Sequence, residues 1–444
     1  MFKSLFFLLV PASAAVVVAC LVPVQSAVDE VIKPKAKNKA VVERRSRSGL
    51  IPTEQSIARF EARLLKRPDD HRSGIVLAKL YARLAKETDD HAAFHEAESR
   101  LRSVLQSLPK SVPARTQLAS VLLAQHSFRE SLVEADRALK INPKAASALA
   151  MKGDAEIELG RYEAASRTYS KLSQLEENAA VFVRQAQLSQ LTGDLHKAFN
   201  LLYRAYADAV ESDLSADAMA WYELRLATFH HQTGRPENAR LHYDRALELV
   251  ENYGPAMVGK ARLLAATDFL DDAEQLLRVA VELHGEPPMM AELGDVLALM
   301  GLNSEAKRWL DKAEAGMAEE AKTAAEPHYR EYALFLADHQ RAPELAVEIA
   351  EKDFLIRQSI HACDTLAWAQ FRAGELADAR SNIERALSTG AKDALIHFHA
   401  GMIFDALGEA TTARVHFDNA LRLNPYFSAT FAMIAEEKRS IIEK

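Results

Sequence analysis

Cysteine is almost absent from this chain of 444 residues, which has only Cys20 and Cys363. Cys20 lies in an apolar N-terminal run, so the rest of the chain has a single thiol. That count excludes an internal disulfide framework and a metal site built from cysteines. We predict that Cys363 is a small buried apolar residue.

Glycine and proline are also scarce, with 16 and 15 residues, and aromatic residues make up only 7% of the chain. Alanine and leucine are abundant, so the composition predicts an almost wholly helical protein. The sequence has no glycine-rich phosphate loop, nucleophile elbow, zinc-protease histidine pair or kinase motif set. We therefore expect no catalytic apparatus and no cofactor.

Basic residues are outnumbered by acidic ones outside the N-terminus. Residues 1–50 have 8 Lys/Arg and 3 Asp/Glu, a balance of +5, whereas the remainder has 47 against 59, a balance of −12. An acidic body repels the phosphate backbone, so we expect no nucleic-acid partner. With no catalytic motif found, the expected partner is a protein or peptide.

The N-terminus has the features of an export signal. Lys3 precedes the uncharged run Leu5–Val24, which contains Pro11 and several small residues. These features favour a signal peptide that comprises residues 1–26 and is cleaved before Ala27. The alternatives are an uncleaved membrane anchor and a loose lipobox that leaves Cys20 lipidated. The expected location is extracytoplasmic, either periplasmic or secreted, with a membrane tether as the alternative.

Residues 27–52 form a basic linker that lacks helical periodicity. We interpret it as a flexible tether, and the alternative is a basic segment that lies on anionic headgroups or an anionic polymer. Its positive charges oppose translocation, although long domains cross membranes despite such charges.

Three series of small residues repeat along the chain with a period of about 34. One series consists of alanines spaced by 33, 34, 40 or 41 residues, and a second follows it seven to eight residues downstream. The third consists of glycines that each precede an alanine of the first series by five residues, namely Gly160, Gly193, Gly234, Gly301, Gly374 and Gly408. A glycine suits the left-handed position that ends a helix, so each unit predicts two helices joined by a short turn.

The pattern resembles the tetratricopeptide repeat family. The resemblance is closest over residues 394–427, where the matching residues are Gly401, Gly408, Ala413, Phe417, Ala420 and Pro425. It implies an all-α fold, a right-handed α-solenoid of about ten helix-turn-helix repeats over 53–427, with a C-terminal capping helix over 428–444. The units begin near 71, 112, 146, 179, 220, 254, 287, 327, 360 and 394.

Two units are about seven residues too long. The extra residues fall at 211–218 and 318–326, and the first unit has an insertion at 86–93. Seven residues are two helical turns, so longer helices and longer loops both fit.

One histidine pair has metal-ligand spacing. His91 and His95 are four residues apart on a predicted helix and could share a face that holds zinc. The sequence supplies no third ligand, so we favour a solvated insertion without metal and keep a metal-dependent enzyme as the weakest alternative.

The resemblance also implies a binding surface. In the family, the first helix of each repeat lines a concave groove with its second, fifth, ninth, twelfth and thirteenth residues. The candidates for partner binding are Gln187, Gln190, Thr228, His231, Arg262, Trp368, Phe371, Phe398, Met402 and Asp405. The lysine–asparagine clamp that some members use for carboxylate tails is missing.

The C-terminal part of this groove is predicted to be aromatic, which suits an extended peptide or a partner helix. The favoured alternative for Trp368 and Phe398 is packing between repeats. The leading hypothesis is thus a non-catalytic interaction scaffold of the cell envelope, and the alternative is a structural protein that assembles end to end.

Overall fold

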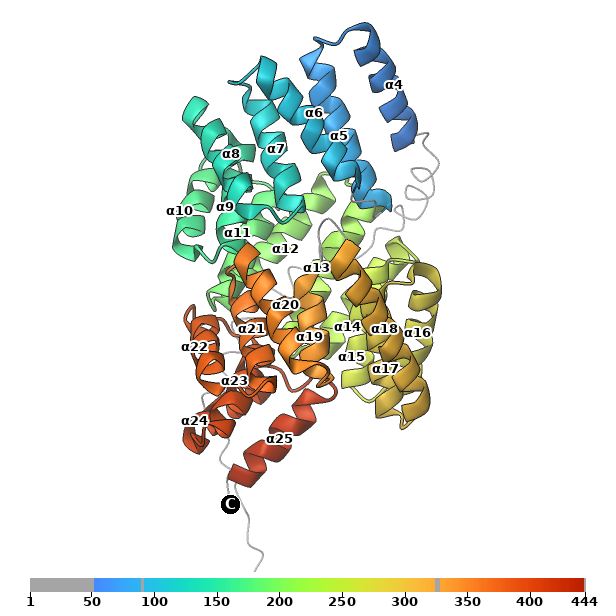
Figure 1. Ribbon diagram of the computed structural model, residues 1–444, viewed down its shortest axis with the longest axis vertical. Coiled ribbons are helices and arrows are strands. Elements are labelled where there is room, and N and C mark those ends of the chain that lie inside the picture. Colours follow the sequence, from blue (N-terminus) through green and yellow to red (C-terminus); the bar gives the residue numbers. More distant parts are fainter. Residues whose placement is uncertain (1–51, 89–91, 324–327, 443–444) are drawn as a thin grey trace, which may run out of the picture. The chain divides into compact units, whose positions relative to one another are not determined.

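The computed structural model describes residues 52–88, 92–323 and 328–442, and within these ranges it contains 22 α-helices and no strand (Figure 1). In chain order they are α4 (Thr53–Lys66), α5 (His71–Thr88), α6 (Ala92–Ser107), α7 (Val112–Ala124), α8 (Phe128–Ile141), α9 (Ala146–Glu158), α10 (Tyr162–Ser173), α11 (Ala179–Leu191), α12 (Leu195–Glu211), α13 (Ala216–Gln232), α14 (Pro236–Leu249), α15 (Gly254–Ala266), α16 (Leu270–His284), α17 (Pro287–Leu299), α18 (Asn303–Thr323), α19 (Tyr329–Asp338), α20 (Pro343–Ile356), α21 (Ile360–Arg372), α22 (Leu376–Leu387), α23 (Ala394–Ala406), α24 (Ala410–Leu423) and α25 (Phe431–Ile442).

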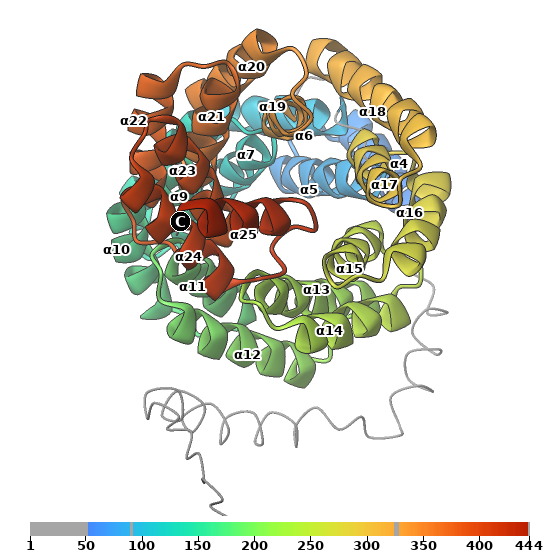
Figure 2. The same cartoon turned by 90° about the horizontal axis from the view of Figure 1, so that it is seen from below.

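The described helices form ten antiparallel pairs, from α5–α6 to α23–α24, with α4 before them and α25 after them. Along residues 216–387, Figure 2 shows the odd-numbered helices on the inside of a superhelix and the even-numbered helices on the outside. We call them inner and outer helices. The predicted all-α solenoid of about ten repeats with a capping helix is confirmed.

Most inner helices end at a residue in the left-handed conformation. The predicted glycines adopt it, for example Gly160 with φ of 69°. Where a repeat has no glycine at this turn, His126, Asp268 and Gln340 adopt the same conformation, with φ of 54°, 67° and 52°. The left-handed turn therefore recurs in more repeats than the glycine does, because other residues adopt this conformation at a modest cost.

The extra residues of the two long units lengthen helices. In the first, α12 and α13 have 17 residues each, whereas α11 has 13. In the second, α18 has 21 residues. The two alternatives that the repeat spacing leaves open are thus resolved in favour of longer helices.

Small residues allow the two helices of a repeat to approach closely. Ala413 is fully buried, and the ring of Phe417 lies over Gly401, where an added Cβ would be 2.5 Å from the ring. Such close-packed positions do not tolerate an extra methyl group without a shift. Cys363 is 3% exposed, so the prediction of a small buried residue is confirmed.

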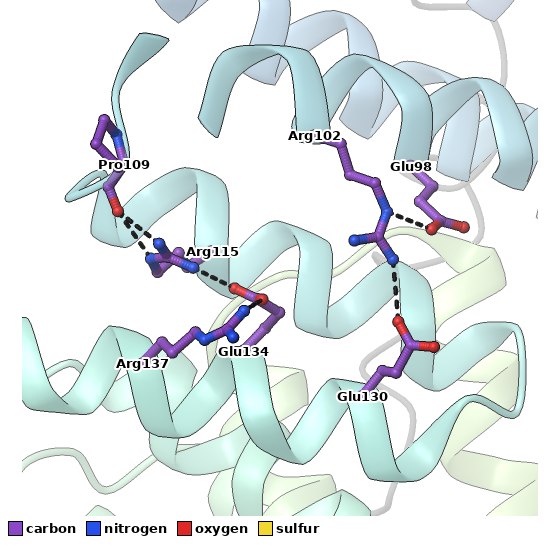
Figure 3. A network of polar contacts seen from close by, with 7 residues as sticks. All are labelled: Glu98, Arg102, Pro109, Arg115, Glu130, Glu134 and Arg137. Atoms are coloured by element: carbon purple, nitrogen blue, oxygen red, sulfur yellow. Dashed lines mark hydrogen bonds and ion pairs between the residues drawn. The ribbon is translucent and has the colours of Figure 1, made fainter. Parts of the chain in front are cut away.

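Ion pairs connect neighbouring helices near the N-terminal end (Figure 3). Arg102 on α6 binds Glu98 at 2.6 Å on the same helix and Glu130 at 3.0 Å on α8. Arg115 on α7 binds the nearly buried Glu134 on α8 at 2.5 Å. These contacts add to the apolar core that the helices share.

Residues about 200 positions apart meet along a seam between successive turns of the superhelix. The Tyr162 hydroxyl accepts a hydrogen bond from the Ile360 amide at 2.7 Å, and the Asn424 side-chain amide donates to the His231 carbonyl at 2.8 Å. The seam therefore places the repeats at α19–α24 directly against those at α8–α13, which the sequence does not predict.

Turn glycines pack against the opposite side of this seam. A Cβ on Gly160 would lie 2.4 Å from the Gln358 carbonyl oxygen, and a Cβ on Gly193 would lie 2.1 Å from the Gly390 carbonyl oxygen. By contrast, a Cβ on Gly374 would have no neighbour within 4 Å. The first two glycines thus serve the turn and the seam together, while Gly374 serves the turn alone.

A buried carboxyl group lies at the same seam. Asp353 is 2% exposed, and its Oδ2 has no hydrogen-bond partner. The Nε of Arg357 is 3.0 Å from Oδ1, but it does not have the geometry of a hydrogen bond. Burial raises the pKa of Asp353 to about 6, although Arg357 and Arg330 oppose this shift. The charged form is therefore disfavoured in the folded protein.

Asp353→Asn is expected to stabilise the protein at pH 8 and to have no effect below pH 4. The folded-state pKa lies above the unfolded value, so the stability associated with the neutral carboxyl is present at low pH and is lost as the pH rises to about 6. The gain at pH 8 is about 3 kcal/mol at most, from ~1.4 kcal/mol per pKa unit. Urea unfolding at the two pH values measures it, and an equal effect at both would contradict the assignment.

Candidate partner-binding surface

Polar contacts connect successive inner helices, and we call this series the inner ladder. Each contact joins residues 30 to 44 positions apart, so it crosses from one repeat to the next. The pairs are Asp154–Arg184 at 2.8 Å, Arg262–Glu292 at 2.6 Å, Asp295–His339 at 2.7 Å, Asp338–Trp368 at 2.7 Å, Asp364–His399 at 2.9 Å and Asp405–Lys438 at 2.6 Å. Several predicted binding residues therefore use their polar groups to hold neighbouring repeats together.

Trp368 and Phe398 do not offer a surface to a partner, which corrects their assignment as binding residues. They are 0% and 1% exposed. The ring of Trp368 stacks on His399 with a centroid distance of 4.1 Å, and Phe398 stacks on Phe431 of α25 at 4.8 Å. Their apolar rings pack between repeats and beneath the capping helix, as the alternative interpretation predicts.

The remaining C-terminal candidates are half-buried and take part in the same packing. Phe371 stacks on Trp368 at 5.0 Å, and Met402 packs against the main apolar cluster. Asp405 binds Lys438 of α25. The predicted aromatic groove at this end is thus occupied by side chains of the chain itself.

Asp338 is the acceptor for the Trp368 indole N–H. Burial raises the pKa of Asp338 to about 6, while His399 and the Trp368 hydrogen bond oppose the shift. A carboxyl that accepts an indole hydrogen bond and lies beside a histidine suits a structural role, because its lone pairs are used within the protein.

His231 and Gln190 are also engaged within the fold. Burial lowers the pKa of His231 to about 4, its ring is 3.4 Å from the Tyr243 hydroxyl, and its carbonyl group lies at the seam. Gln190 contacts Gln232 of the next inner helix at 3.4 Å. Both residues connect elements of the solenoid.

The predicted residues that stay accessible lie on the inner helices α11, α13 and α15. Gln187 and Thr228 are half-buried, and the Arg262 side chain is 54% exposed although it pairs with Glu292. The structure adds Trp221, which is 40% exposed, and Arg225 one turn later on α13. Trp221 holds the second position of its repeat, so the family's positional rule includes it, whereas Arg225 lies at a position that the rule leaves out.

His91 of the predicted metal pair lies outside the described residues. His95 Nδ1 is 3.2 Å from the Gln125 amide nitrogen. In the described part of the chain, no group of three or more His, Cys, Asp and Glu side chains has a metal-binding arrangement. The signal peptide, the lipobox and the basic linker also lie outside the described residues.

Among residues 52–88, 92–323 and 328–442, no helix has the length and hydropathy that a membrane span requires.

The tetratricopeptide repeat model matches residues 116–173 and 365–426, which correspond to α7–α10 and α21–α24. A search of curated proteins finds no match to this sequence. A crystal structure of the APC/C hetero-tetramer Cut9–Hcn1 aligns with 88% of this chain and 94% of that chain, at 14% identity and a TM-score of 0.36.

Two further solved structures align at similar levels. Yeast Tom70 aligns with 83% of this chain and 96% of its own, at 12% identity and a TM-score of 0.33. A tetratricopeptide repeat protein from Parabacteroides merdae aligns with 60% of this chain and 99% of its own, at 15% identity and a TM-score of 0.34.

Stacked helix pairs of this kind form extended surfaces that serve as scaffolds for protein interactions. Ten helix pairs of one form, with the family model matched in two separate parts of the series, show that the chain contains tetratricopeptide repeats.

Proposed function

We propose that this protein is a non-catalytic scaffold outside the cytoplasm that binds an extended segment of a partner protein on its inner helices. The apolar N-terminal run with small residues before Ala27 supports the location. The repeat fold supports the scaffold role. The binding surface is centred on α13, with contributions from α11 and α15.

The observation that carries this proposal is the exposed Trp221 on an inner helix. The C-terminal candidates are covered by α25 or use their polar groups in the inner ladder, whereas Trp221 keeps 40% of its surface exposed. An exposed aromatic residue beside an arginine is a common anchor for a partner chain. Arg225 lies one helical turn from Trp221, with its guanidinium 6.0 Å from the ring.

Site-specific photo-crosslinking tests the surface. A photoreactive phenylalanine analogue replaces Trp221 in the full chain, expressed in its own host. The matched control replaces Val133, which is 47% exposed on the outer helix α8. We expect a protein adduct at the first position only. Adducts of equal yield at both positions, or at neither, would rule the surface out.

The intact mass of the protein from the host tests the location. A chain that starts at Ala27 indicates a free exported protein, and a chain that starts at an acylated Cys20 indicates a lipid-tethered one. Recovery of the uncut chain from the cytoplasmic fraction would contradict the proposed location.

A further inference from the structure

One rung of the inner ladder joins a carboxylate to an arginine through two parallel hydrogen bonds. Arg184 Nε donates to Asp154 Oδ1 at 2.8 Å, and its Nη2 donates to Oδ2 at 2.9 Å. Asp154 lies six residues before the turn glycine Gly160, and Arg184 lies nine residues before Gly193. The rung therefore joins fixed positions of two successive repeats.

The next rung has the arginine but not the acid. Gln187 lies six residues before Gly193, and Arg225 lies nine residues before Gly234. These are the positions of Asp154 and Arg184, moved along by one repeat. A neutral amide thus stands where the preceding rung has its carboxylate, and Arg225 lacks the counter-ion that Arg184 receives.

Among the described residues, the surroundings of Arg225 also lack a counter-ion. Its Nε is buried and has no hydrogen-bond partner, and its guanidinium makes a cation–π contact with the Trp221 ring. Burial lowers the pKa of Arg225, with no carboxylate to oppose the shift. Buried charges in folded proteins are normally paired, because an unpaired one is costly.

Other arginines with an unpartnered nitrogen differ in this respect. Burial lowers the pKa of Arg372, but the nearby Asp338 opposes this shift. Arg330 lies near Asp353, where its charge opposes the rise in the pKa of that carboxyl that burial causes. Arg245 also has a buried nitrogen without a partner, but it lies on the outer helix α14. Arg225 combines a buried unpartnered nitrogen with an inner position and no carboxylate.

We propose that Arg225 binds an acidic side chain of the partner, which supplies the carboxylate that Asp154 supplies to Arg184. The partner segment includes this acidic residue, and it lies along α11 and α13 with Trp221 beside the bound carboxylate. This inference rests on the proposed function, since it names the chemistry of the segment that the inner helices hold. Pairing of a guanidinium with a carboxylate through two hydrogen bonds is the strongest form of such recognition.

The test measures fluorescence anisotropy of labelled peptides on the full chain. The probe is hexaglutamate with both ends blocked, and the control peptide is hexaglutamine with a free C-terminal carboxylate, which separates side-chain from chain-end recognition. We expect hexaglutamate to bind and Arg225→Met to weaken it at least tenfold. Arg167→Gln, on the outer helix α10 with a side chain 71% exposed, should change binding less than twofold.

Gln187→Asp gives the sharper result, because it rebuilds the ion pair inside the protein. We expect this variant to raise the melting temperature and to weaken hexaglutamate at least tenfold, since the new carboxylate competes for Arg225. Gln187→Asn adds no carboxylate, so it should not raise the melting temperature. Asp154→Asn should lower the melting temperature, which shows that the equivalent rung contributes to stability.

Three results would overturn the inference: no hexaglutamate binding to the unaltered chain, equal binding of hexaglutamine, or unchanged binding in both Arg225→Met and Gln187→Asp. The photo-crosslinking at position 221 can be repeated in the Arg225→Met variant. If the same partner protein is crosslinked in equal yield, this inference fails while the proposed function stands. If no protein is crosslinked at position 221, the proposed function itself fails.

Discussion

Gly193→Ala is expected to lower the free energy of unfolding by about 2–5 kcal/mol, whereas Gly374→Ala lowers it by about 1–2 kcal/mol. Both glycines have φ of 81°, so the alanine incurs the same left-handed backbone cost at each. At Gly193 the added Cβ also meets the Gly390 carbonyl oxygen at 2.1 Å, and at Gly374 it meets nothing within 4 Å. The difference between the two variants therefore measures the seam.

Urea unfolding followed by circular dichroism compares the two variants, and small-angle X-ray scattering reports on the seam directly. We expect a larger radius of gyration for Gly193→Ala and an unchanged one for Gly374→Ala, because opening the seam separates successive turns. Equal losses of stability with equal radii would show that the clash at Gly193 is relieved without moving the seam.

Glu223→Ala is expected to destabilise the protein by about 2–6 kcal/mol, because two buried partners would each lose an acceptor at a cost of about 1–3 kcal/mol. The Glu223 and His242 side chains are both 3% exposed, and His242 Nδ1 is 2.6 Å from the carboxylate. The Tyr206 hydroxyl donates to the other carboxylate oxygen at 2.7 Å. Alanine would leave both partners without an acceptor in the interior of α12–α14.

The neighbouring residues make this cluster sensitive to the loss. The Tyr203 hydroxyl lies 3.0 Å from His230 Nε2 and 3.3 Å from His242 Nε2, so the hydrogen bonds are connected. Burial lowers the pKa of His230 to about 3, and it also raises the pKa of Tyr206. The His230 imidazole and the Tyr206 phenol are therefore neutral at neutral pH, and the Glu223 carboxyl group is the main acceptor of the cluster.

A double-mutant cycle with Glu223→Gln and His242→Gln isolates the pair. Thermal and urea unfolding should give a coupling free energy of about 1–3 kcal/mol, because the two residues share one network. Glu130→Gln, at a surface ion pair whose acid is 64% exposed, is the control and should cost less than 1 kcal/mol. Additive effects of the two buried substitutions would contradict a shared network.

The candidate site shows what the family's rule of binding positions predicts and what it does not. The rule correctly selects residues of the inner helices, since it names which residue of each repeat lies on that face. It does not tell an accessible residue from a covered one. Trp368 and Phe398 satisfy the rule but are buried, because His399 and Phe431 stack on their rings. The cover comes from the next repeat and from α25.

Local sequence determined the helix pairs, the turns between them and the small residues at which they pack. These features depend on residues within one repeat, where a glycine at the turn or an alanine on a helix face acts on neighbours a few positions away. The tertiary structure alone decided that Gly193 meets Gly390 and that Tyr162 meets Ile360. Those contacts depend on the small rotation between repeats, added up over the repeats that separate them, and no single repeat encodes that sum.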